Sequence, residues 1–373
     1  MFSKIAILGL GQLGGSFALA CRNAGIGEQI IGYDPITHHG QLLIMNEAID
    51  DIAETPALAV KEADLIMLSA PLRAYPALAQ AIAPHVKKTA VITDIGSVKQ
   101  PMQDIAAVLN GIAIVPAHPI AGSEKAGAAV ANGALFEEKL LIITPLESTP
   151  SHATERVRRL WEKLDSQVME LPVTIHDQIY AHVSHLPHLI AFVASSFLYR
   201  QGLRVGKDDM TLQKFLRISR SNPRMWTDIF IENRTAILPA LAAYKSILGH
   251  FVKELREGEN APTDQDIKPV AARYLPRILA ASLISTVSVY EQHAGASVRR
   301  FGAGGMRDIV APAAEEPEID IEEISKTAAI VALLIEGILP LFEEVERLMT
   351  LNEEPQLFAH LQAIEKEATA LVS

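Results

Sequence analysis

A glycine-rich turn near the start of this 373-residue chain constrains its fold more than any other feature. The turn, G-L-G-Q-L-G at residues 9–14, follows a short apolar run and precedes a helical pattern at residues 16–24. A second apolar run at residues 29–33 leads into Asp34, which lies 20 positions after the last glycine. A strand, a glycine turn, a helix, a strand and an acid in this order are typical of a dinucleotide-binding βαβ unit.

Each glycine of the turn has its own physical role. Gly9 permits the tight turn, Gly11 lets the backbone approach a pyrophosphate, and Gly14 lets the helix pack closely on the strand. Asp34 would accept hydrogen bonds from the ribose hydroxyls, and its charge would repel a 2′-phosphate. We therefore expect these four residues to bind NAD rather than NADP. A glycine turn without a ligand is the alternative interpretation.

Apolar runs and helical stretches continue to alternate up to about residue 172. The runs expected to form strands are residues 64–71, 90–93, 112–115, 140–144 and 168–171. This pattern predicts a Rossmann-type, doubly wound parallel sheet. Ligands bind such sheets outside the carboxyl ends of the strands. We expect Ala70 and Pro71 to contact the cofactor there, beside the loops at residues 94–99 and 118–127.

The composition limits the class of protein. The formal net charge is −11, 49% of the residues are hydrophobic, and basic residues form no long run, which argues against a nucleic-acid or membrane partner. The longest apolar stretch, residues 327–341, contains Glu336 and Pro340 and is too short to span a bilayer. The single cysteine, Cys21, fits a reducing compartment. We expect a cytoplasmic enzyme that acts on a small molecule.

Helical periodicity dominates after about residue 174. The main helical stretches are residues 179–199, 225–251, 271–292 and 321–349, with polar loops expected at residues 256–266 and 311–320. The expected fold class is therefore an α/β Rossmann-type doubly wound parallel sheet followed by an all-α domain. We place the NAD-binding domain at residues 1–172. The helical substrate-binding and dimerisation domain, with a C-terminal helical extension, takes residues 173–373 and is expected to form a homodimer.

Two motifs of the helical half could carry chemistry. In S-H-L-P-H (residues 184–188) the histidines are three apart, and His182 has the same spacing. No carboxylate or cysteine lies in the cluster, so no metal site is expected; the histidines are either core residues or a contact to a substrate oxygen. In L-R-I-S-R-S-N-P-R-M-W (residues 216–226), Arg217 is either a surface side chain or a bidentate carboxylate ligand.

Together these motifs resemble the prephenate dehydrogenase (cyclohexadienyl dehydrogenase) family of tyrosine biosynthesis, over roughly residues 5–241. The matching motifs are G-L-G-Q-L-G-G-S, A-D-L-I-M-L-S-A-P, T-D-I-G-S-V-K, H-P-I-A-G-S-E-K-A-G, H-D, S-H-L-P-H and R-I-S-R-S-N-P-R-M-W. The resemblance implies conversion of prephenate and NAD⁺ into 4-hydroxyphenylpyruvate, CO₂ and NADH.

The resemblance also implies a role for each site residue. His118 would hydrogen-bond the ring hydroxyl and take its proton, and Ser97 would orient His118 or the nicotinamide. For Ser97 a helix N-cap is the structural alternative. Arg217 would bind the ring carboxylate, and His188 would contact the side chain, which favours a keto acid. Glu124 would gate the site by pairing with Arg217.

The chain departs from the family pattern before Arg217. It reads T-L-Q-K-F-L-R, so the usual glycine, aspartate and threonine are missing and Lys214 stands in place of the aspartate. A similar cluster, G-A-G-G-M-R-D, occurs at residues 302–308 and makes Arg307 a rival ligand for the ring carboxylate.

Three other functions remain open at this point. One is an arogenate dehydrogenase, whose substrate has an amino group in place of the keto oxygen. A second is another dehydrogenase that acts on a hydroxy acid. The third is a catalytically silent NAD-binding sensor, against which the presence of His118, Ser97 and Arg217 argues. The resemblance does not explain the extension after about residue 256.

Overall fold

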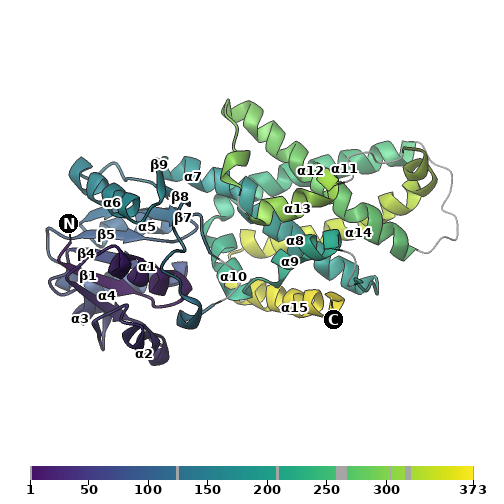
Figure 1. Ribbon diagram of the computed structural model, residues 1–373. Helices are drawn as coiled ribbons and strands as arrows, with labels where there is room; N and C mark the ends of the chain where they lie inside the picture. The colour runs from purple at the N-terminus through teal and green to yellow at the C-terminus, as the bar shows by residue number, and fades with distance from the viewer. Residues whose placement is uncertain are drawn as a thin grey trace. The chain divides into compact units, whose positions relative to one another are not determined.

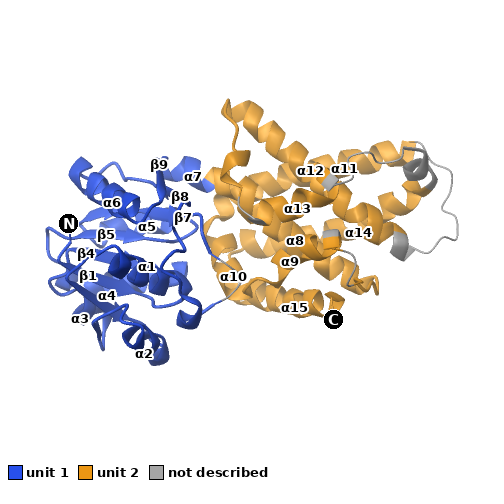
Figure 2. Ribbon diagram, viewed as in Figure 1, with its two compact units in different colours: residues 1–177 blue, residues 178–373 orange. Residues whose placement is uncertain are grey.

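The computed structural model describes residues 2–122, 126–206, 210–257, 267–302, 304–315 and 321–372. The chain forms two compact units, residues 1–177 and 178–373 (Figure 1 and Figure 2). Within the described residues, all strands belong to the first unit, and the second unit is helical.

The first unit is built on a six-stranded parallel sheet with the order β3-β2-β1-β4-β5-β6. The chain starts at a central strand and winds outward in both directions, which confirms the doubly wound topology. Adjacent crossovers leave the sheet in opposite directions between β1 and β4, where such folds bind their ligands. The strands are β1 (Lys4–Leu8), β2 (Gln29–Tyr33), β3 (Asp51–Ile52), β4 (Leu65–Leu68), β5 (Val91–Asp94) and β6 (Ala113–Val115).

Every residue of β4 and β5 is buried, because helices cover both faces of the sheet. These helices and the others of this unit are α1 (Gln12–Asn23), α2 (Thr37–Met45), α3 (Pro56–Val60), α4 (Tyr75–Ile82), α5 (Gln100–Asp104), α6 (Ser151–Lys163) and α7 (Val173–Tyr180), which runs on into the second unit. Helix α5 is short, because it ends at Asp104 and a 3₁₀ turn follows.

A separate three-stranded sheet replaces the expected extension of the parallel sheet. It consists of β7 (Ala117–Pro119), β8 (Leu140–Ile143) and β9 (Gln167–Glu170), with β7 antiparallel to β8. The expectation that the last two runs join the main sheet is therefore wrong. The physical reason is that β8 pairs with the short strand β7 on one side and with β9 on the other, so neither β8 nor β9 pairs with β6.

An aromatic cluster joins the two sheets of the first unit. The fully buried Trp161 of α6 packs against Phe17 and Phe136, with ring centroids 5.4 and 5.1 Å apart. Residues of β6 and β8 belong to the same core. This packing fixes β7, which carries His118, relative to the parallel sheet.

The second unit is a helical assembly around α8, whose side chains are almost all buried. A π-helical turn, Ala181–His185, leads into α8. The helices are α8 (Leu186–Arg200), α9 (Met210–Arg217), α10 (Pro223–Glu232), α11 (Arg234–Glu257), α12 (Ile267–Ala294), α13 (Gly304–Glu315), α14 (Ile321–Thr350) and α15 (Glu354–Val372).

The loop expected at residues 311–320 is wrong in its first half. Residues 311–315 belong to α13, which includes Pro312 and packs against α9 and α12. Tertiary packing overrides the local signal of the proline there. Residues 316–320 lie outside the described part of the chain, as does most of the loop expected at residues 256–266.

Three helical segments are long and apolar enough to cross a membrane by length and composition. They are Val173–Arg200, Arg234–Glu257 and Val270–Ala294, and 83%, 28% and 67% of their most apolar windows are buried in the fold. Packing within the unit accounts for most of the apolar surface of the first and the third. The absence of a membrane partner stays a prediction.

Candidate active site

The three fingerprint glycines lie where a side chain would obstruct the turn or its ligand. Gly9 has a φ of +104°, and a Cβ there would lie 2.6 Å from the backbone of Ser69 and Ala70. A Cβ on Gly14 would lie 2.0 Å from the carbonyl oxygen of Gly9, so only glycine lets α1 pack on this loop. At Gly11, where α1 begins, a Cβ would meet nothing within 4 Å. This open helix N-terminus fits a pyrophosphate.

Asp34 ties the end of β2 to the glycine turn. Its Oδ2 accepts a hydrogen bond from the Leu10 amide at 2.6 Å, and its Oδ1 accepts one from the Ile36 amide at 2.8 Å. The carboxylate is thus fixed beside the N-terminus of α1, where it can accept from ribose hydroxyls and would repel a 2′-phosphate. Ala70, next to Pro71, lies against the same turn. These residues fit NAD.

His118 belongs to a chain of hydrogen bonds that fixes its tautomer. Its Nδ1 lies 2.9 Å from Nε2 of His176, and Nδ1 of His176 lies 2.7 Å from Oδ1 of Asp177. A carboxylate only accepts, so His176 must carry its proton on Nδ1 and accept at Nε2. His118 then donates from Nδ1, which leaves the lone pair on its Nε2. Burial and the charge of Lys99 hold the pKa of His176 well below its usual value.

Asp177 also caps the helix that follows β5. Its two carboxylate oxygens accept hydrogen bonds from the amides of Lys99 and Gln100, at 2.9 and 3.0 Å. The alternative role of Ser97 as an N-cap is therefore wrong, because α5 begins at Gln100 and its cap comes from Asp177. Ser97 lies half-buried in the preceding loop.

A buried ion pair anchors the strand that carries His118. The Lys99 ammonium donates to Oδ2 of Asp94 and to the Ala117 carbonyl oxygen, both at 2.6 Å. Oδ1 of Asp94 accepts from the Ala117 amide at 2.9 Å, and the Tyr75 hydroxyl donates to Oδ2 at 3.1 Å. Burial raises the pKa of Asp94 and lowers that of Lys99, and the opposite charge of each partner counteracts this.

The sequence alone predicts no site role for Asp94, Lys99 or His176. The signal was present in the motifs T-D-I-G-S-V-K and H-D, which place acids and a lysine at strand and helix ends. Their joint role depends on contacts across 18 to 78 residues.

In the second unit, His188 lies flat against Trp226, with ring centroids 3.7 Å apart and an interplanar angle of 23°. Its Nδ1 donates to the Ser184 carbonyl oxygen at 2.8 Å, so its Nε2 is a hydrogen-bond acceptor. Burial lowers the pKa of His188 to about 3. His188 is therefore neutral throughout the physiological range.

The other histidines near this motif have structural partners. His182 donates from Nδ1 to the Gln178 carbonyl oxygen at 2.9 Å and stacks on Tyr290. Nδ1 of the fully buried His185 lies 2.8 Å from the Asn233 side-chain nitrogen. Among the described residues, no group of three His, Cys, Asp or Glu side chains could hold a metal ion.

Arg217 and Arg307 differ in their surroundings. Arg217 donates from Nε to Oδ2 of Asp308 at 2.8 Å and also pairs through Nη2, whereas Arg307 is exposed. Asp308 therefore supplies the acid that is missing before Arg217 in the sequence. Glu124, expected to pair with Arg217, lies outside the described residues.

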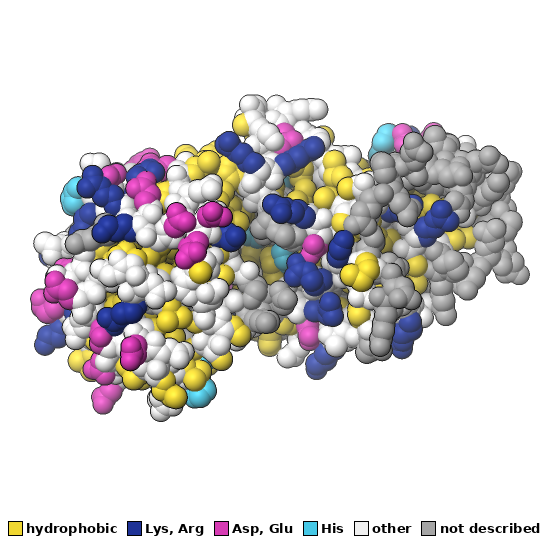
Figure 3. Space-filling model, in the orientation of Figure 1, with side chains coloured by type: hydrophobic (Ala, Val, Ile, Leu, Met, Phe, Trp, Pro, Cys, Tyr) yellow, Lys and Arg dark blue, Asp and Glu magenta, His cyan; other side chains and the backbone are white. Residues whose placement is uncertain are grey.

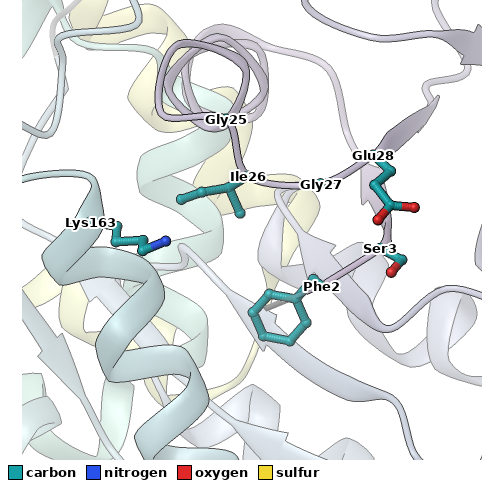
Figure 4. A pocket seen from close by; sticks show the side chains of 7 residues that line it. All are labelled: Phe2, Ser3, Gly25, Ile26, Gly27, Glu28 and Lys163. Atoms are coloured by element: carbon teal, nitrogen blue, oxygen red, sulfur yellow. The ribbon is translucent and has the colours of Figure 1, made fainter.

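A small pocket in the first unit is not part of this arrangement. It has a volume of about 180 Å³ and is lined by Phe2, Ser3, Lys163 and residues 25–28 (Figure 4). It lies where β1 and β2 begin, at the edge of the sheet opposite to Gly9 and Asp94. Because of this position, we do not expect the pocket to hold a ligand that binds at Gly9, Gly11 and Gly14.

Comparisons with known proteins agree with the geometry. Residues 17–170 match the family model described as prephenate dehydrogenase, nucleotide-binding domain, and residues 172–264 match prephenate dehydrogenase, dimerization domain. The chain is 33% identical over 279 residues to a cyclohexadienyl dehydrogenase of Zymomonas mobilis subsp. mobilis, which covers 71% of this chain and 90% of the relative. It is 32% identical over 250 residues to a Bacillus subtilis prephenate dehydrogenase, covering 64% and 66%.

A solved structure shows the same similarity. The crystal structure of a prephenate dehydrogenase from A. aeolicus, in complex with hydroxyphenyl propionate and NAD⁺, is 29% identical to this chain. The match has a TM-score of 0.63 and covers 79% of this chain and 99% of that one.

The buried neutral histidines predict a pH-dependent stability. His188 becomes protonated near pH 6.5 in the unfolded chain, but only near pH 3 in the folded chain. The stability that the neutral ring contributes is therefore fully present above about pH 7 and is lost as the pH falls from 6.5 toward 3. Urea unfolding should show a free energy that falls with decreasing pH. In His188→Asn the slope should be shallower by up to about 1.4 kcal/mol per pH unit. An unchanged slope would contradict this account.

Proposed function

The chain belongs to the prephenate dehydrogenase family, and on that premise we propose that His118 is its catalytic base in the NAD-dependent oxidative decarboxylation of prephenate. The products are 4-hydroxyphenylpyruvate and CO₂, and the reaction is a step of tyrosine biosynthesis. The observation that supports this role best is the hydrogen-bond chain from Asp177 through His176, which fixes the lone pair of His118 on Nε2.

His118 moves the proton that the oxidation releases. Its Nε2 accepts the proton of the C4 hydroxyl as the C4–H bond breaks and a carbonyl forms at C4. The bond from C1 to the carboxylate then breaks, CO₂ leaves, and its electron pair makes the ring aromatic. The phenolate oxygen takes a proton back. NAD⁺, when bound, supplies the acceptor for the hydride from C4.

His176 and Asp177 support the charged state of His118. When His118 becomes an imidazolium, its Nδ1–H still donates to Nε2 of His176, so no hydrogen bond has to rearrange. The carboxylate of Asp177 lies at the end of the same chain and compensates the positive charge. Ser97, in the loop before α5, orients His118 or the nicotinamide.

The second unit binds the substrate's anionic groups in this proposal. Arg217 binds the ring carboxylate, His188 contacts the side chain, and Glu124 gates the site by pairing with Arg217. On the visible face of the described helical unit, Lys and Arg side chains gather while acids are sparse (Figure 3). Such a surface attracts a dicarboxylate although the chain as a whole is negatively charged.

The assembly and the location are part of the proposal. The match of residues 172–264 to a dimerization domain supports a homodimer formed through the helical unit. The buried Cys21 and the single-cysteine composition support a cytoplasmic location.

One observation favours arogenate as a second substrate. Nε2 of the neutral His188 accepts a hydrogen bond and cannot donate one to a keto oxygen or a carboxylate. The amino group of arogenate can donate to it. The hydrogen-bonding geometry of His188 therefore supports a keto acid as the substrate less strongly than the family resemblance does.

The first test compares the substrates and cofactors directly. Purified protein with NAD⁺ and prephenate should produce NADH, followed by its absorbance, and NADP⁺ should support a much lower rate because Asp34 repels the 2′-phosphate. Turnover of arogenate but not prephenate would move the assignment to the second candidate. NAD binding without turnover of either would indicate a sensor and refute the catalytic proposal.

Replacing the base should affect catalysis rather than cofactor binding. His118→Asn should lower kcat by about 10²–10⁴-fold, the range for a lost general base, with the affinity for NAD⁺ retained. The matched control is His152→Asn, at an exposed position on α6 of the same unit, which should leave kcat unchanged. A kcat of His118→Asn within threefold of the wild type would exclude His118 as the base.

The two candidate carboxylate ligands can be separated by KM. Arg217→Ala should raise KM for prephenate by about 10–100-fold, as expected for a lost charged hydrogen bond. Arg307→Ala should leave KM within a factor of two, because its side chain is exposed. The reverse pattern would assign the ring carboxylate to Arg307.

A further inference from the structure

A segment beyond the matched family domains contacts both substrate ligands of the second unit. The matched dimerization domain ends at residue 264, whereas α13 begins at Gly304. α13 packs against α8, which carries His188, and against α9, which carries Arg217. Two residues of its first turns, Gly305 and Asp308, make these contacts.

Asp308 holds Arg217 by one defined edge of the guanidinium. Nε and Nη2 of Arg217 both pair with Oδ2 of Asp308, 91 residues away in the chain. Because the Nε–Nη2 edge faces Asp308, the Nη1–Nη2 edge of the guanidinium points away from Asp308. That second edge can bind the carboxylate of a substrate with two parallel hydrogen bonds. The Arg217 side chain is 39% exposed, so without a partner it would sample many rotamers.

Gly305 leaves the space that the His188 ring occupies. A Cβ on Gly305 would lie 2.6 Å from Cε1 of His188, closer than such atoms approach in proteins. The imidazole therefore stacks on the Trp226 indole and has its Cε1 atom close to the backbone of α13 at Gly305. Any side chain at position 305 would push the ring away from its place.

We propose that the first turns of α13 are a built part of the substrate site, in which Asp308 positions Arg217 for the ring carboxylate and Gly305 leaves room for His188. Asp308 and Gly305 are thus positioning residues, which act through Arg217 and His188. The inference rests on the proposed function, since it deepens the roles given there to Arg217 and His188.

Steady-state kinetics of the full chain test the role of Asp308. Asp308→Ala should raise KM for prephenate about tenfold and change kcat less than threefold, and Asp308→Asn, which keeps one acceptor oxygen, should have an intermediate KM. The inhibition constant of the product 4-hydroxyphenylpyruvate should stay unchanged, because the product has lost the ring carboxylate. A general loss of structure would weaken both ligands.

A double-mutant cycle asks whether Asp308 acts through Arg217. In an Arg217→Ala background, Asp308→Ala should raise KM no further. The control is Glu336→Gln, because Glu336 accepts from the same edge of another arginine in the unit, through Oε1 from Nε and through Oε2 from Nη2 of Arg256. This control should leave KM unchanged.

The position of Gly305 is tested with a second helical glycine as control. Gly305→Ala should raise KM for prephenate, although alanine favours a helix by up to about 1 kcal/mol. Gly249→Ala in α11, where a Cβ would meet nothing within 4 Å, should not change KM.

The outcomes separate this inference from the proposed function. Wild-type turnover with Asp308 and Gly305 variants that keep the wild-type KM would overturn the inference alone. A lower KM in Asp308→Ala would also overturn it, since Asp308 would then compete with the substrate for Arg217. Absence of wild-type turnover with prephenate and arogenate would overturn both. If Asp308→Ala does not fold, the same measurements are made with Asp308→Asn, alone and combined with Arg217→Ala, and their KM values test the inference.

Discussion

The buried ion pair between Asp94 and Lys99 is the interaction on which the position of His118 depends. Both side chains are fully buried, and each charge is tolerated there because the other partner and a set of hydrogen bonds compensate its desolvation. Together they bind the amide and the carbonyl of Ala117, the residue before His118. Removal of one partner from such a pair typically costs about 3–5 kcal/mol. The pair therefore joins the end of β5 to the short strand that carries His118.

Asp177 connects this anchor to the chemistry. One carboxylate caps α5 at Lys99 and Gln100 and also fixes the tautomer of His176. A shift of α5 would therefore move the hydrogen-bond acceptor of His118 as well. The same carboxylate thus fixes both the position of His176 and the tautomer of His118, whose lone pair stays on Nε2.

The features that the sequence predicted are those with local physical causes. Gly9, Gly11 and Gly14 meet requirements of one turn and the helix that follows, so their spacing was enough to place them. His118 was placed near a ligand because it follows a strand. The separate sheet of β7, β8 and β9 was not predicted, because apolar runs do not specify their partners. The alternative role of Ser97 as a helix N-cap was wrong, because the structure caps α5 with Asp177, an acid from another helix.

The same distinction explains the departure before Arg217. The local pattern lacks an acid, and Lys214 stands in its place, which by itself leaves the orientation of Arg217 undetermined. The structure provides the acid from α13, 91 residues further along the chain. A side chain can be held equally well by a neighbour in sequence or by a neighbour in space, provided that the two helices pack firmly. The helical extension of this chain is therefore tied to Arg217 and His188 rather than appended to a complete domain, because α13 packs against the helices that carry these two residues.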